Sequence, residues 1–152
     1  MGVIVVGVDG SEGSKYAVDY AAKEAAVHGH RLRLVGAWEI PPSVLTAGIA
    51  GRDFYEEFEK QAVRALEEAA ARVTAVAPSV AHEEVVAEGQ AAKVLLANAE
   101  DADMLVVGRR GYGTFREMLL GSVSRQLTVH AKCPLVLVPS PPPKREAHGQ
   151  GG

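Results

Sequence analysis

Cysteine is nearly absent from this chain: Cys133 is the only one among 152 residues. A single thiol excludes an internal disulfide framework and a cysteine-based metal cluster. The five histidines show no metal-ligand spacing either, so we predict no metal site. Cys133 directly precedes Pro134 at the entrance to a predicted strand, which favours a buried structural thiol.

Long apolar runs and concentrations of basic charge are also missing. No stretch approaches the roughly 20 apolar residues that a membrane helix needs. The N-terminus reaches Asp9 without the basic region or cleavage site of a signal peptide. The formal net charge is -3 and the basic residues are scattered, so we expect no nucleic-acid partner. These absences predict a cytoplasmic protein that does not associate with membranes.

Familiar catalytic signatures are lacking too. Neither the Gly-x4-Gly-Lys-Ser/Thr phosphate loop of many ATPases nor the dinucleotide fingerprint follows the first predicted strand. No Ser-His-Asp set and no paired carboxylates stand at a recognisable spacing. The sequence therefore predicts no catalytic residue.

What the chain does contain is a regular alternation of strand and helix patterns. Apolar residues recur at helical spacing in 14–27, 54–73 and 90–100, and a further helix is predicted for 122–130. Short apolar runs typical of strands covered on both faces lie between them, at 3–8, 32–38, 80–87, 104–107 and 135–138. This alternation predicts an α/β fold of one domain, with a parallel sheet and helices on both faces.

Two segments fall outside this pattern. Residues 41–51 are rich in turn formers and are expected to form a flexible connector. Residues 140–152 combine three prolines, charges and terminal glycines, which is typical of a disordered tail. The predicted domain therefore occupies residues 1–139.

Polar residues and glycines follow two of the predicted strands. Asp9-Gly10-Ser11 comes after the first strand, and Gly108-Arg109-Arg110-Gly111 comes after the fourth. Ligands of open α/β sheets bind beyond the carboxyl ends of strands, which makes both segments candidates for a binding site. Asp9 alone is equally consistent with a turn or a helix cap. Arg109 either screens phosphate charge or is simply solvated.

A further glycine follows later in the same connection, where Gly121-Ser122-Val123-Ser124 opens a predicted helix. Glycines let main-chain N–H groups approach an anion. The first N–H groups of a helix have no partner within it and lie at its positive dipole end. Ser122 and Ser124 add hydroxyl donors, although Ser122 is also a favoured N-cap. We therefore expect a polyphosphate ligand here.

The spacing Gly108-x2-Gly111-x9-Gly121-Ser122 resembles the ATP-binding signature of the universal stress protein family. The similarity extends over about residues 1–139, from the run that begins at Ile4 to the closing Cys133–Val138 segment. The resemblance implies a doubly wound five-stranded parallel sheet of order 3-2-1-4-5. It also implies a homodimer joined through the last strand, Leu135 to Val138, which would otherwise be an apolar sheet edge.

The resemblance further implies which residues bind the nucleotide. Asp9 would contact the nucleoside portion, Ala37 would offer its main chain to adenine, and the glycine loop would wrap the ribose and phosphates. The implied cofactor is ATP with or without Mg²⁺, and cyclic AMP is an alternative ligand. The complete set of predicted cofactor-binding residues is Asp9, Gly10, Ala37, Gly108, Arg109, Gly111, Gly121, Ser122, Val123 and Ser124.

The leading hypothesis is an ATP-binding regulatory dimer with a role in stress responses. Three alternatives stay open at this point. The same site would serve a weak ATPase or phosphotransferase, or a binder of cyclic AMP. Finally, a scaffold would keep its pocket empty and act through its dimer interface.

Overall fold

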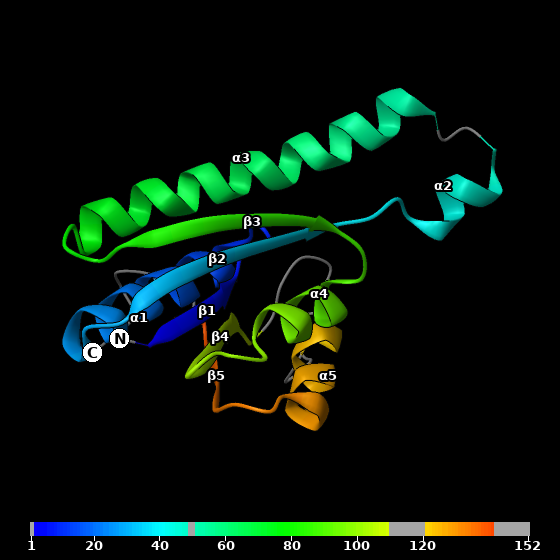
Figure 1. Cartoon of the computed structure of the whole chain (residues 1–152). Helices are drawn as coiled ribbons and strands as arrows, with labels where there is room; N and C mark the ends of the chain where they lie inside the picture. The colour runs from blue at the N-terminus through cyan, green and yellow to red at the C-terminus, as the bar shows by residue number, and fades with distance from the viewer. Residues whose placement is uncertain (1, 49–50, 110–120, 142–152) are drawn as a thin grey trace, which may run out of the picture.

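The computed structural model describes residues 2–48, 51–109 and 121–141 and forms one five-stranded, all-parallel sheet (Figure 1). The strand order is β3-β2-β1-β4-β5, which confirms the predicted doubly wound fold. The strands are β1 (Val3–Gly7), β2 (Arg31–Trp38), β3 (His82–Glu88), β4 (Met104–Gly108) and β5 (Leu135–Val138). The helices are α1 (Glu12–His28), α2 (Pro42–Thr46), α3 (Arg52–Val76), α4 (Ala91–Asn98) and α5 (Ser122–His130).

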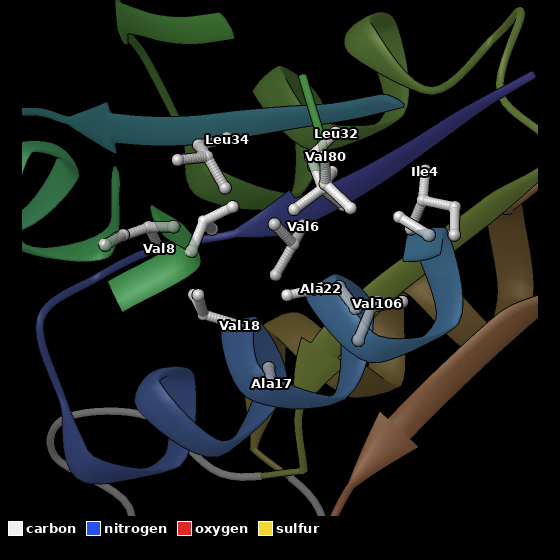
Figure 2. Close-up of a cluster of buried hydrophobic side chains, with 14 of the residues drawn as sticks. Ile4, Val6, Val8, Ala17, Val18, Ala22, Leu32, Leu34, Val80 and Val106 are labelled. Atoms are coloured by element: carbon white, nitrogen blue, oxygen red, sulfur yellow. The ribbon is translucent and has the colours of Figure 1, made fainter. Parts of the chain in front are cut away.

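The sheet separates two apolar clusters. Helices α1 and α3 cover one face, where Ile4 and Val6 of β1 are buried against Val18 and other residues of α1 (Figure 2). Helices α4 and α5 cover the other face, where Val5 is buried. Strand β1 thus contributes to both clusters, as its unbroken apolar run predicts.

Within the described residues, no helix is long and apolar enough to cross a membrane.

Several element boundaries differ from the prediction. β3 begins at His82 rather than at residue 80, because Val80 closes a turn by donating its N–H to the carbonyl of Ala77 at 3.0 Å. The expected connector 41–51 contains the short helix α2, which has Pro42 at its first position, a site that suits proline. Most of the tail expected to be disordered, from residue 142 onward, lies outside the described residues.

The two edges of the sheet differ in chemistry. β3 carries three acidic residues, Glu83, Glu84 and Glu88, whereas β5 consists of four partly exposed apolar residues. Charged side chains on an edge strand discourage pairing with another sheet, and apolar ones do not. Of the two edges, β5 is therefore the one better suited to pair with a strand of another chain.

Arg33 of β2 joins three elements on the α4 face of the sheet. Its guanidinium donates to Glu83 of β3 at 2.9 Å, to Asp101 ahead of β4 at 2.9 Å, and to the carbonyl of Asn98 at 2.7 Å. The last bond satisfies a carbonyl at the end of α4. The hydrogen bond with Asp101 raises the pKa of Arg33 and lowers the pKa of the Asp101 carboxyl. The Arg33 side chain is only 14% exposed, whereas its acidic partners Glu83 and Asp101 are 44% and 67% exposed.

Replacing Arg33 with methionine is expected to destabilise the fold by about 1 kcal/mol at neutral pH, because the apolar stem remains but the charged hydrogen bonds, two of them to exposed carboxylates, are lost. The pKa of Asp101 is lowered in the folded state, so its contribution exists above the unfolded pKa and disappears as pH falls through the folded pKa. The difference between Arg33→Met and wild type should therefore be constant from about pH 5 to 8 and shrink below about pH 4. Urea unfolding across this range measures it.

Arg31→Met is the matched control. Arg31 reaches Glu83 at 3.4 Å and is 43% exposed. Such an exposed pair contributes little, so this substitution should cost under about 0.5 kcal/mol. Equal decreases in the free energy of unfolding for the two variants would contradict the role given to Arg33.

Candidate functional site

A crevice opens at the carboxyl end of β1 because both neighbouring strands extend further. The pairing of β1 with β2 ends at Gly7 and Val35, whereas β2 continues to Trp38 and stays paired with β3. On the other side β4 continues to Gly108, beyond its last pair with β1. The strand order reverses at this point, which is where open α/β sheets bind ligands.

A cavity of about 210 Å³ lies in this crevice. This volume is below the roughly 300–1,000 Å³ of typical small-molecule sites. Its walls come from the ends of β1, β2 and β4 and from the first turns of α1, α4 and α5. The lining residues are Gly7, Val8, Asp9, Ser11, Ser14, Val35, Ala37, Ala91, Leu95, Val107, Gly108, Gly121, Ser122, Val123 and Ser124.

Most of the residues predicted from the sequence meet at this cavity. Gly10 and Arg109 are adjacent to lining residues but are not part of the lining, and Gly10 instead borders a neighbouring cavity between α1 and α3. Gly111 lies outside the described residues. The predicted residues that line the cavity are Asp9, Ala37, Gly108, Gly121, Ser122, Val123 and Ser124.

Asp9 organises the turn that leads into α1. Its Oδ1 accepts hydrogen bonds from the main-chain N–H of Ser11 at 2.9 Å and from the Ser11 hydroxyl at 2.6 Å. Ser11 in turn caps α1 by accepting from the N–H of Ser14 at 3.2 Å. Gly10 adopts a φ of 82° between them, a conformation that favours glycine. Asp9 is exposed and also lines the cavity, so the turn and a ligand contact are compatible roles.

The start of α5 differs from the start of α1. Gly121 rather than Ser122 is the N-cap, and Ser122 is the first helical residue, with an exposed side chain. No side chain of the described residues caps the first N–H groups of α5, and the same holds for α4, whose first residue Ala91 lines the cavity. Uncapped helix starts attract anions through their N–H groups and the helix dipole.

The Ser124 hydroxyl points toward the main chain. Its Oγ lies 3.0 Å from the carbonyl oxygens of both Gly108 and Arg109, and the residue is only 3% exposed. A serine hydroxyl has one hydrogen to donate, and here carbonyls receive it. Ser124 is therefore placed to hold the helix start, whereas the sequence suggested a donor to phosphate.

The sequence reasoning included the Asp9-Gly10-Ser11 segment in the site but missed Ser14 and one apolar wall of the cavity. Ser14 follows Ser11 by three residues at the start of a helix, and this serine spacing was the available signal. The apolar wall contains Val35 and Leu95, which belong to β2 and α4 and meet only after folding. Among the described residues, no group of three or more metal-ligating side chains occurs.

Substituting Asp9 by alanine is expected to lower the free energy of unfolding by about 1 kcal/mol, because Ser11 loses the acceptor for two hydrogen bonds. Asp9→Asn keeps an oxygen acceptor and should stay within about 0.5 kcal/mol of wild type. Urea unfolding at neutral pH measures both. If alanine and asparagine cost the same, the turn does not depend on this acceptor.

Comparison with known proteins finds extended similarity. A family model described as the universal stress protein family matches residues 1–139. A universal stress protein of Thermus aquaticus, named for its location in the 3' region of a QAH/OAS sulfhydrylase, is 34% identical over 137 residues, which cover 89% of this chain and 96% of that protein.

A longer relative and a solved structure extend this comparison. A universal stress protein of Mycobacterium tuberculosis is 35% identical in an alignment that covers 95% of this chain and 50% of that protein. The chain thus spans about half the length of its mycobacterial relatives. Among solved structures, a universal stress protein in complex with cAMP is 29% identical, with a TM-score of 0.66 over 90% of this chain and 95% of that chain.

Proposed function

Since the chain belongs to the universal stress protein family, we propose that it is an ATP-binding regulatory protein of the cytoplasm that acts as a homodimer in stress responses. The observation that carries this proposal is the cavity at the end of β1, where uncapped helix starts face an apolar wall. An adenine nucleotide has the matching chemistry, because it joins an apolar ring to an anionic group.

The adenine ring would occupy the apolar side of the cavity. Val35, Ala37 and Leu95 line this side, and none of them brings a charge. Pockets for small molecules are typically apolar with a few polar groups that fix orientation. At the end of β2 the main chain of Ala37 is suited to supply such polar groups to the ring edge.

The phosphates would lie at the start of α5. The N–H groups of Ser122 and Val123 and the Ser122 hydroxyl are the donors there, and Gly121 presents no Cβ to obstruct them. Asp9 is the one acidic or basic side chain among the described lining residues. Its carboxylate suits ribose hydroxyls, and Mg²⁺ bound to the phosphates would offset the repulsion between two anionic groups.

Cyclic AMP is the second candidate ligand. It is the molecule bound in the related solved structure that is 29% identical to this chain. Its single phosphate needs fewer donors than a triphosphate, which suits a lining whose described residues include no lysine or arginine. Competition of ATP and cyclic AMP for one fluorescent adenine nucleotide analogue separates the two candidates.

A binding role is favoured over hydrolysis. Asp9 is the single general acid or base among the described lining residues, and its Oδ1 is engaged by Ser11. Slow ATP hydrolysis is the enzymatic alternative, and it predicts turnover that disappears in Asp9→Ala. An empty-pocket scaffold is the non-binding alternative, and it predicts no nucleotide retained by the natively purified protein.

Gly121→Val is expected to abolish ATP binding and leave the fold intact. Gly121 is buried in the cavity wall, so added methyl groups compete with the ligand, and its φ of -74° is accessible to valine. Calorimetric titration with ATP and circular dichroism measure the two effects.

Gly51→Val is the matched control for this variant. Gly51 is also an N-cap glycine without a side-chain cap, at the start of α3, and a Cβ there would meet nothing within 4 Å. It should bind ATP like wild type. Unchanged ATP affinity in Gly121→Val would place the ligand elsewhere and refute the proposed site.

The homodimer would form through β5. This strand has an unprotected apolar edge, and β3 at the other edge is acidic. Pairing two copies of β5 would continue the sheet across the interface and cover apolar surface on both faces.

Leu137→Lys is expected to convert the dimer to a monomer, because a lysine on an edge strand opposes pairing. Val86→Lys on β3 is the control: Val86 is 37% exposed on the opposite edge and should leave the dimer intact. Light scattering after size exclusion measures the mass. A dimer that survives Leu137→Lys but dissociates in Val86→Lys would assign the interface to β3.

A further inference from the structure

Gly108, the last residue of β4, touches the main chain of α1. A Cβ added to Gly108 would lie 2.8 Å from both the carbonyl carbon and the carbonyl oxygen of Gly13, and 3.3 Å from its Cα. Real Cβ atoms do not approach other atoms at 2.8 Å, and main-chain atoms have no rotamer by which to move aside. Glycine is required here because the first turn of α1 occupies the position of a side chain.

The same segment holds the start of α5 on its other side. The Ser124 hydroxyl lies 3.0 Å from the carbonyl oxygens of Gly108 and Arg109, and the N–H of Gly121 donates to the Arg109 carbonyl at 3.0 Å. The main-chain N–H of Arg109 in turn donates to the carbonyl of Val138 in β5 at 2.9 Å. The end of β4 is thus a spacer between two helix starts.

We propose that Gly108 and Ser124 are positioning residues that, together with Gly13, set the separation between the first turns of α1 and α5. We call these three residues the helix-start joint. The two turns form opposing walls of the cavity, through Ser11 and Ser14 on α1 and through Ser122 and Val123 on α5. The joint therefore sets the width of the nucleotide site, an inference that rests on the function proposed above.

This role differs from a direct contact with the ligand. If Gly108 served only to admit phosphate, an added methyl group would disturb the bound state and leave the ligand-free protein unchanged. In the helix-start joint, the methyl group displaces the main chain of Gly13 before any ligand arrives. The first turn of α1 then shifts, and the wall on the far side of the cavity shifts with it.

Gly108→Ala and Gly36→Ala form a matched pair to test the joint. Gly36 in β2 is buried but is not part of the cavity lining, and the nearest neighbour of a Cβ there would be the Leu66 side chain at 3.3 Å. A leucine side chain can adjust by a few tenths of an ångström, so Gly36→Ala should be tolerated. The readouts are hydrogen exchange of the ligand-free protein and calorimetric ATP affinity.

Two amides report on the helix starts. At the start of α1 the N–H of Lys15 donates to the main-chain carbonyl of Ser11. At the start of α5 the N–H of Arg125 donates to the main-chain carbonyl of Gly121. In Gly108→Ala both amides should exchange about tenfold faster than in wild type without ligand, and ATP affinity should fall by about tenfold or more. In Gly36→Ala both quantities should stay within about threefold of wild type.

Ser124 variants test the joint independently, should Gly108→Ala fail to fold. Ser124→Ala removes the hydroxyl and should speed the exchange of the Arg125 amide and weaken ATP binding. Ser124→Thr keeps the hydroxyl and should restore both.

Two outcomes would overturn the inference, and a third would refute the proposed function. Weaker binding with unchanged exchange in the ligand-free variants means direct ligand contact. Faster exchange with unchanged affinity means that the joint has only a structural role. A wild-type protein that binds no adenine nucleotide refutes the proposed function and its dependence on the joint, whereas the exchange rates still decide whether Gly108 holds the helix starts.

Discussion

The contact between the main chains of Gly13 and Gly108 is the constraint on which the site depends. It joins the start of a helix to the end of a strand with no side chain between them. Side chains can change rotamer, whereas main-chain atoms move only when the elements that carry them move. The separation between the serine-capped start of α1 and the start of α5, which no side chain of the described residues caps, therefore depends on the packing of these elements.

The electrostatics of the cavity follow from that arrangement. The described lining contains one charged side chain, the carboxylate of Asp9, so attraction of an anion depends on helix N–H groups and dipoles. Such groups are already oriented and need no side-chain ordering when a ligand binds. Donors that are oriented in advance lower the cost of binding such an anion.

The sequence predicted the architecture well and the details of the site in part. Its alternation of apolar runs gave a parallel α/β sheet, and the family resemblance gave the strand order. It did not predict Arg33, because a charged residue inside a strand finds its partners at Glu83 and Asp101, far along the chain. It did not predict the hydrogen bonds of the Ser124 hydroxyl, because the carbonyls of Gly108 and Arg109 belong to another part of the chain. Patterns of neighbouring residues report on local structure, and these contacts are not local.

The unequal edges of the sheet bear on how far association can proceed. A sheet whose two edge strands can both pair with other chains can add further copies at each edge and grow into a fibre, as in aggregation through unpaired strands. Here the glutamates of β3 border one margin, and the apolar residues of β5 form the other. If two copies pair through β5, as proposed above, the pair presents acidic β3 edges outward. Among the residues that the structure describes, such a pair would have no wholly apolar edge left for a third copy.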